Sequence, residues 1–214
     1  MAANVILPGM PRCAAMAAAP AARPAPSLRE RKKARTREAI AAAALQRFAQ
    51  DGYDAVTVAS IAAAADVAPR TVFRYFPAKE ELLFAEDEAI RAVIVGALTA
   101  RPADEGAFAA LRAAALTLAA GFDGRRAELA ERQAVIEAAP ALLARDRAKQ
   151  ARLESDVAAA LRARGEPPDR ASLLARIAGA CFQEGLARWL AVRRGGPGLP
   201  ARVNDAFDEA AAAG

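Results

Sequence analysis

Alanine is the feature of this sequence that most restricts the folds open to it. The chain has 214 residues, and 64 of them are alanine. Alanine is the best helix former and buries little surface, so the hydrophobic fraction of 55% indicates helix rather than a strongly apolar core. Aromatic residues make up only 5%, and runs of the β-branched residues that strands favour are few. The composition predicts an all-α protein.

The absence of histidine excludes several enzyme classes. Without it, neither a Ser-His-Asp triad nor an HExxH zinc site can form. The two cysteines, Cys13 and Cys181, are far apart and have no metal-ligand spacing. The sequence therefore predicts no catalytic residue, no metal site and no cofactor, and it predicts that the protein is not an enzyme. A chain without a disulfide framework is typical of a reducing cytoplasm.

The chain shows no membrane segment, because no apolar run reaches the roughly 18 residues that a spanning helix needs. Residues 1–26 are rich in alanine and proline and are predicted to form a disordered tail. Residues 27–80 hold ten Lys and Arg against six Asp and Glu, most of the net charge of +5. Their densest basic run is RERKKARTR, at 29–37. Taken alone, this run is either a solvated helix start or an arm that binds a polyanion.

Three helices are predicted after the start of this run. The first spans 36–50, with Thr36 as its N-cap and Gly52 as its stop. The second begins after Thr57, another N-cap, and ends near Ala65.

A third helix follows a tight turn at Asp66, a residue type that tolerates the left-handed conformation. It starts at Pro69, which suits a first helical turn, and ends near Pro77. Val72 and Phe76 are four residues apart and face inward. The opposite face carries Arg70, Thr71, Arg74 and Tyr75. The second and third helices are short, and the third is basic on its outer face and apolar on its inner face. This arrangement describes a helix-turn-helix. On the residues alone, the alternative is a small bundle with an incidentally basic face.

The stretch TREAIAAAALQRFAQDGYDAVTVASIAAAADVAPRTVFRYFPAKEELL resembles the DNA-binding domain of the tetracycline-repressor (TetR) family. The resemblance is long and without gaps. Its matching residues are Thr36, Arg37, Ile40, Phe48, Gly52, Tyr53, Thr57, Val58, Ile61, Ala62, Val67, Thr71, Val72, Tyr75, Phe76, Lys79, Glu80 and Leu82. It implies that the third helix, which starts at Pro69, enters the major groove, where arginine reads guanine and threonine contacts thymine methyls.

The resemblance also implies roles for single residues. Pro69, Arg70 and Thr71 correspond to the base-facing start of the recognition helix, while Tyr75 and Lys79 match phosphate-contacting positions. The hydroxyls of threonines at helix starts would lie near phosphates, and the basic arm would follow the backbone or enter the minor groove. The full set of expected DNA contacts is Arg29, Arg31, Lys32, Lys33, Arg35, Thr36, Thr57, Pro69, Arg70, Thr71, Phe73, Arg74, Tyr75 and Lys79.

Three positions depart from the family pattern. Ala68 replaces the usual serine, which removes a hydroxyl cap. Phe73 replaces a frequent tyrosine and offers only apolar contact. Asp66 stands where glycine is common and brings a negative charge near the DNA side.

The sequence divides into a tail at 1–26, a DNA-binding domain at 27–78 and a helical domain at 79–214. Glycine and proline signals separate the helices of the last part. These helices are predicted near 79–98, 104–122, 126–138, 140–164, 169–193 and 200–213. In the family, such a domain binds a small molecule and dimerises through its last two long helices.

The helix predicted at 169–193 suits dimerisation because Gly179, Ala180 and Gly185 would permit close approach of another helix. It also carries more apolar surface than one side needs, although an ordinary core helix would account for the same residues. A two-fold dimer reads two half-sites, which a lone helix-turn-helix does not. We therefore expect a homodimer that binds a palindromic operator.

The stretch from Val135 to Leu190 is also similar to regulators of the mycofactocin-associated type within the family. That similarity implies a bulky apolar or acyl-type effector. Candidate pocket residues mix apolar bulk with isolated polar groups, although any one of them could instead belong to the core or the interface. They are Phe108, Leu111, Phe122, Gln133, Glu137, Cys181, Phe182, Gln183 and Trp189.

These observations together predict a cytoplasmic homodimeric repressor that a small-molecule effector releases from its operator. In this prediction, the helix at 79–98 transmits the signal between the two domains. The alternative is an architectural DNA-binding protein that responds to no ligand.

Overall fold

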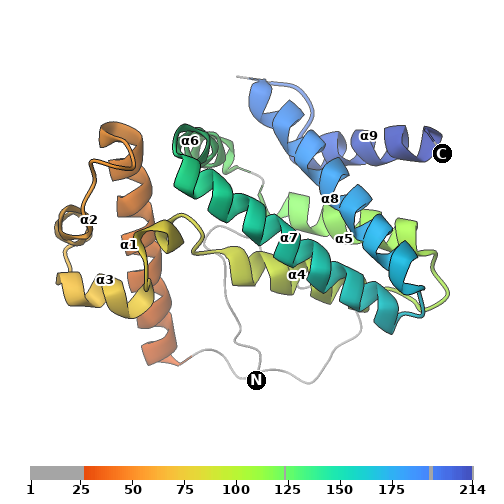
Figure 1. Ribbon diagram of the computed structural model, residues 1–214, viewed down its shortest axis with the longest axis horizontal. Helices are drawn as coiled ribbons and strands as arrows, with labels where there is room; N and C mark the ends of the chain where they lie inside the picture. The colour runs from red at the N-terminus through yellow and green to blue at the C-terminus, as the bar shows by residue number, and fades with distance from the viewer. Residues whose placement is uncertain (1–26, 123, 193–194, 214) are drawn as a thin grey trace. The chain divides into compact units, whose positions relative to one another are not determined.

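The computed structural model describes residues 27–122, 124–192 and 195–213, and these contain helices but no strand (Figure 1). The all-α prediction is confirmed, while the predicted tail at 1–26 lies outside the described residues. The chain forms two compact units. The first unit runs to Ala89 and includes Glu131–Leu142, and the second holds Ile90–Ala130 and the residues from Leu143 onward.

This division differs from the boundary at residues 78 and 79 that the sequence predicts. Leu82, Leu83 and Phe84 follow that boundary, and all three are buried. The apolar segment after the predicted boundary therefore completes the first unit instead of opening the second.

The first unit is built from α1 (Leu28–Asp51), α2 (Val58–Ala64), α3 (Pro69–Tyr75) and the 3-10 helix η1 (Lys79–Leu82) (Figure 1). Its core is apolar and draws on every one of these helices. The core side chains include Ile40, Leu45, Phe48, Ile61, Ala62, Val72, Phe76 and Leu82. The inward face predicted for α3, Val72 and Phe76, is confirmed.

Helix α1 begins eight residues before the predicted start. Ser27 caps it with a capping box: the Glu30 N–H donates to Ser27 Oγ at 3.2 Å, and the Ser27 N–H donates to Glu30 Oε2 at 2.8 Å. The prediction that Thr36 is an N-cap is wrong. Its hydroxyl donates to the Lys32 carbonyl at 3.0 Å, one helical turn back. The predicted basic arm is therefore the first two turns of a helix.

The turns between these helices agree with the predictions made from the sequence. Gly52 has φ +81°, and its N–H donates to the Phe48 carbonyl at 3.0 Å, so it ends α1 as predicted. Asp66 has φ +52°, the left-handed conformation expected for the turn between α2 and α3.

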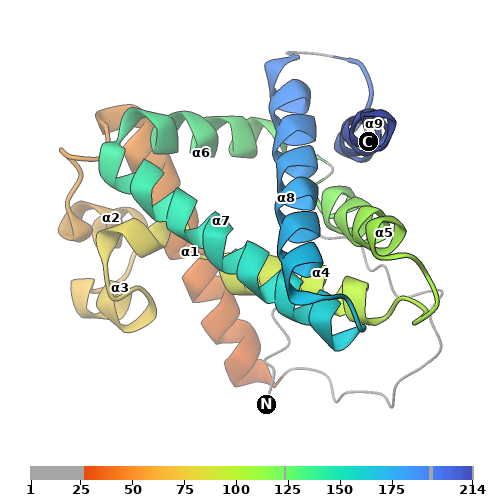
Figure 2. The same cartoon turned by 45° about the vertical axis from the view of Figure 1, so that its right-hand side comes forward.

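The remaining helices are α4 (Asp87–Thr99), α5 (Ala107–Ala120), α6 (Arg126–Ala138), α7 (Pro140–Ala163), α8 (Pro168–Ala191) and α9 (Leu199–Ala212). The single helix predicted at 79–98 is wrong, because η1 and a turn precede α4. In the second unit α5, α8 and α9 pack against one another (Figure 2). Among the described residues, none of the helices is both long and apolar enough to cross a membrane.

Gly185 of α8 faces α9, and the two backbones are in close contact there. A Cβ at this position would lie 2.7 Å from the Cα and the backbone nitrogen of Val203. Gly185 therefore permits close packing within one chain, whereas the sequence had suggested close packing between two chains. Arg188 supports the same helix pair, since its guanidinium bonds Glu184 at 2.7 Å and Glu209 of α9 at 2.6 Å.

Candidate nucleic-acid interface

The outward face of α3 is formed by side chains that the core does not use. Val72 and Phe76 are each 1% exposed. On the other side of the helix, Arg70, Phe73 and Arg74 are exposed. The amphipathic pattern thus anchors α3 by two apolar side chains and leaves two guanidinium groups and one phenyl ring free to meet a ligand.

The start of α3 has the geometry expected for a proline-led helix. Pro69 occupies its first turn, and Ala68 precedes it with an extended backbone and no side-chain cap. The Thr71 N–H bonds the Ala68 carbonyl at 2.7 Å. The hydroxyl cap that a serine would supply is absent here, as the sequence indicated.

Thr57 caps α2, which confirms the predicted N-cap. Its Oγ1 accepts from the Ser60 N–H at 3.1 Å, and Ser60 Oγ donates to the Thr57 carbonyl at 2.8 Å. Thr57 is exposed. Its hydroxyl hydrogen can therefore still be donated to a phosphate oxygen.

Lys79 is half-buried and rests on an aromatic surface. Its Nζ lies 4.2 Å from the centre of the Tyr53 ring and 3.5 Å from the Asp54 carbonyl oxygen. The Tyr53 hydroxyl donates to Glu80 Oε1 at 2.7 Å. Burial and this bond raise the pKa of Tyr53 far above its usual value, and hydrogen bonds from the Glu80 backbone and from Tyr53 lower the pKa of the Glu80 carboxyl.

Arg37 holds three parts of this unit together, a role that the sequence did not reveal. Its Nη1 donates to the Tyr75 carbonyl and its Nη2 to the Ala85 carbonyl, each at 3.1 Å. The guanidinium carbon also lies 4.5 Å from the centre of the Phe76 ring. Burial lowers the pKa of Arg37. One side chain of α1 thereby fixes the end of α3 and the segment that follows η1.

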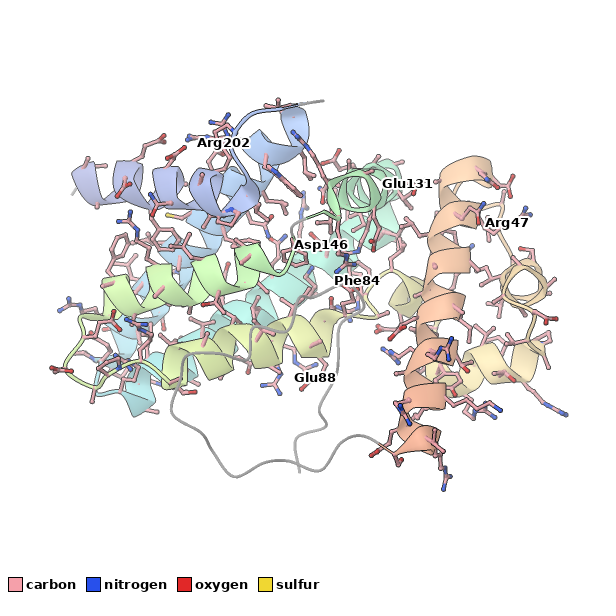
Figure 3. The ribbon with its side chains drawn as sticks, turned by 180° about the vertical axis from the view of Figure 1, so that it is seen from behind. Arg47, Phe84, Glu88, Glu131, Asp146 and Arg202 are labelled. Atoms are coloured by element: carbon pink, nitrogen blue, oxygen red, sulfur yellow. The ribbon has the colours of Figure 1, made fainter. Side chains whose placement is uncertain are left out.

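Arg132 of α6 binds the same segment. Its Nε donates to the Leu83 carbonyl at 2.8 Å, and its guanidinium carbon lies 5.4 Å from the centre of the Phe84 ring. Phe84 itself is buried, and Figure 3 labels it. The bonds of Arg37 and Arg132 therefore hold this segment through the carbonyl groups of Leu83 and Ala85.

The other expected DNA contacts lie on two helices. Thr71 and Tyr75 are half-buried on α3, and the Arg74 guanidinium carbon lies 5.1 Å from the centre of the Tyr75 ring. The basic residues of the first turns of α1 are all exposed, whereas Thr36 is half-buried. These are Arg29, Arg31, Lys32, Lys33 and Arg35.

The candidate pocket residues do not form one group. Leu111, Phe122, Cys181 and Trp189 are buried in the core of the second unit, and burial raises the pKa of the Cys181 thiol. Further members pack as rings there: Phe122 and Phe182 lie 6.4 Å apart, and Phe108 lies 5.4 Å from Phe207.

Three polar candidates are placed differently. Gln133 and Glu137 belong to the first unit, where they bond each other at 2.8 Å. Gln183 is exposed on α8. The sequence also missed Arg126, which donates to the Trp189 carbonyl and lies 5.3 Å from the centre of its ring.

Residues 40–85 match the family described as bacterial regulatory proteins, tetR family. They include the second half of α1, all of α2 and α3, and η1. Over these residues the chain is similar to the DNA-binding domains of that family. The chain is also 43% identical over 89 residues to the HTH-type transcriptional regulator TcmR of Streptomyces glaucescens. That similarity covers 42% of this chain and 39% of TcmR, so it spans less than half of either protein.

Two solved structures extend the likeness to the whole fold. A TetR-family regulator from Streptomyces coelicolor matches with a TM-score of 0.52 and 21% identity, over 89% of this chain and 98% of its own. A TetR-like transcriptional regulator from Rhodococcus sp. RHA1 matches with a TM-score of 0.51 and 21% identity, over 83% of this chain and 94% of its own. At these identities the likeness shows only that the chain shares the fold of these two regulators.

Proposed function

We propose that the protein is a sequence-specific DNA-binding transcriptional regulator that acts as a homodimer in the cytoplasm. The observation that carries the proposal is the outward face of α3, where Arg70, Phe73 and Arg74 are exposed on a TetR-family domain. In a dimer formed through α8 and α9, the two copies of α3 would enter successive major grooves. The basic start of α1 would contact phosphates.

We further propose that the protein is a repressor, and that an apolar or acyl-type effector binds the second unit, as its similarity to mycofactocin-associated regulators implies. The second unit is apolar inside, and its Phe122 and Phe182 rings lie 6.4 Å apart, so a site opened there would offer apolar contacts to such a ligand. The effector would favour a conformation whose recognition helices are wrongly spaced for the operator. A coupling of about 1–3 kcal/mol would change operator affinity by roughly 5- to 150-fold.

Selection of bound sequences from random DNA tests the DNA-binding part. We expect a palindrome whose half-sites lie about one helical turn apart. A diffuse preference with no half-site would contradict the proposal and favour an architectural protein. All selections should be run at one stated salt concentration, because phosphate contacts make affinity depend on salt.

Binding of acyl-chain probes tests the effector part. Trp189 is the only tryptophan and is buried in the second unit, so its fluorescence reports on that unit. Oleate and palmitoyl-CoA are suitable probes, and we expect one of them to change this signal and to release the protein from the selected operator. If both probes leave fluorescence and operator binding unchanged, the acyl class of effector is wrong.

Replacing Arg70 with alanine is expected to weaken operator binding by about 1–3 kcal/mol and to relax specificity at one base pair. The reason is that Arg70 is exposed near the start of α3, where an arginine can form two bonds to guanine. The measurement is the affinity for the operator and for its single-base variants. Equal weakening on random DNA would contradict base recognition.

Replacing Lys79 with alanine is expected to weaken binding to all DNA sequences alike. It should also reduce the magnitude of the slope of log affinity against log salt by about one. The Lys79 ammonium is held over Tyr53, and its remaining hydrogens can meet a phosphate. Salt titrations of the operator and of random DNA measure the effect. A loss confined to the operator would show that Lys79 does not act through phosphate.

A further inference from the structure

Phe73 is an exposed aromatic residue on an otherwise charged surface. The residue is 54% exposed, and among the described residues only Leu28 and Leu173 are other large apolar residues with comparable exposure. Arg70 precedes it by three residues and Arg74 follows it directly, so all three share the outward face of α3. An apolar ring beside two guanidinium groups gains free energy when a partner that also suits those groups covers it.

The ring contacts of α3 leave Phe73 available for such a partner. Arg37 stacks on Phe76, and Arg74 lies over Tyr75. Phe73 has no hydroxyl, so it cannot bond a phosphate oxygen. Whatever Phe73 contributes to DNA binding must therefore come from contact with apolar groups.

The thymine C5-methyl is the apolar group that the major groove displays, whereas the other base edges present donors and acceptors there. A phenyl ring placed against those polar edges would leave them without hydrogen-bond partners. We infer that Phe73 is a specificity-determining residue that selects a thymine, next to a guanine read by Arg70 or Arg74. The inference rests on the proposed function, because it assigns one base of the site that α3 would read.

Uracil in place of thymine tests the inference, because the exchange removes only the methyl group. The probe is the operator found by selection from random DNA, with each thymine of one half-site replaced in turn by deoxyuridine. For the unchanged protein, we expect one position at which affinity falls about fourfold, which corresponds to roughly 0.8 kcal/mol for one buried carbon group. In Phe73→Ala, the same exchange should leave affinity unchanged.

Two further measurements separate apolar contact from general damage. Phe73→Leu keeps an apolar side chain and should remain sensitive to deoxyuridine. A cytosine at the same position should weaken binding by the unchanged protein, and 5-methylcytosine should recover part of that loss. Because Phe73 is exposed, both variants should keep the circular dichroism spectrum and the unfolding midpoint of the unchanged protein.

The inference is overturned if the unchanged protein tolerates deoxyuridine at every thymine, or if Phe73→Ala is equally sensitive to the exchange. Either result, obtained with a selected palindrome, would leave the proposed function intact. If selection yields no half-site, the proposed function fails and the inference fails with it.

Discussion

Replacing Arg37 with alanine is expected to lower the free energy of unfolding of the first unit by about 3 kcal/mol. The change removes two charge-assisted hydrogen bonds, to the carbonyls of Tyr75 and Ala85, and the stacking on Phe76. Bonds to charged groups contribute roughly 1.5–3 kcal/mol, and a buried carbonyl left without a donor adds its desolvation cost. Operator affinity should fall as well, since Arg37 fixes the end of α3.

Urea unfolding followed by two signals measures this effect. Trp189 fluorescence reports the second unit, whereas circular dichroism reports all helices. We expect Arg37→Ala to shift the dichroism curve to lower urea with little change in the fluorescence midpoint.

Arg35→Ala is the matched control, because Arg35 is exposed on the same helix and should change stability by less than about 0.5 kcal/mol. Arg37→Lys keeps the charge but loses the planar fork and should be intermediate. Equal stability of Arg37→Ala and the unchanged protein would contradict the role assigned to Arg37.

Local signals in the sequence predicted most of the helices. Gly52, Asp66 and Pro69 each act through their own backbone preference, so the turns around α2 and α3 could be placed without knowledge of the fold. The early start of α1 also had a local signal. Ser27 and Glu30 have the spacing of a capping box, but the dense basic run after them was interpreted as an arm.

Contacts between distant residues could not be predicted in this way. The two carbonyls that Arg37 binds lie 38 and 48 residues further along the chain. Arg37 matches the family pattern, but neither that match nor its neighbours in the sequence indicate which carbonyl groups it binds. The polar pocket candidates show the same limit, since Gln133 and Glu137 were chosen by residue type and belong to a different unit from Trp189.

Gly185 is a second residue whose role depends on a distant partner, and we expect Gly185→Ala to destabilise the second unit by about 2 kcal/mol. Alanine inside a helix normally gains about 1 kcal/mol over glycine. Here the new Cβ would lie 2.7 Å from backbone atoms of Val203, which cannot move without separating α8 from α9. Overpacking of this kind costs roughly 1–3 kcal/mol and occasionally more.

Gly179→Ala is the matched control on the same helix. Its Cβ would meet only the flexible side chain of Glu154, at 3.4 Å. The gain in helix propensity is the same for both substitutions, so Gly179→Ala should be neutral or stabilising, and the two variants should differ by about 3 kcal/mol. Urea unfolding followed by Trp189 fluorescence measures the difference, because that residue is buried on α8. If both variants proved equally stable, the close contact between α8 and α9 at Gly185 would not constrain the fold. Glycine there would then have to serve another contact, such as the one between two chains.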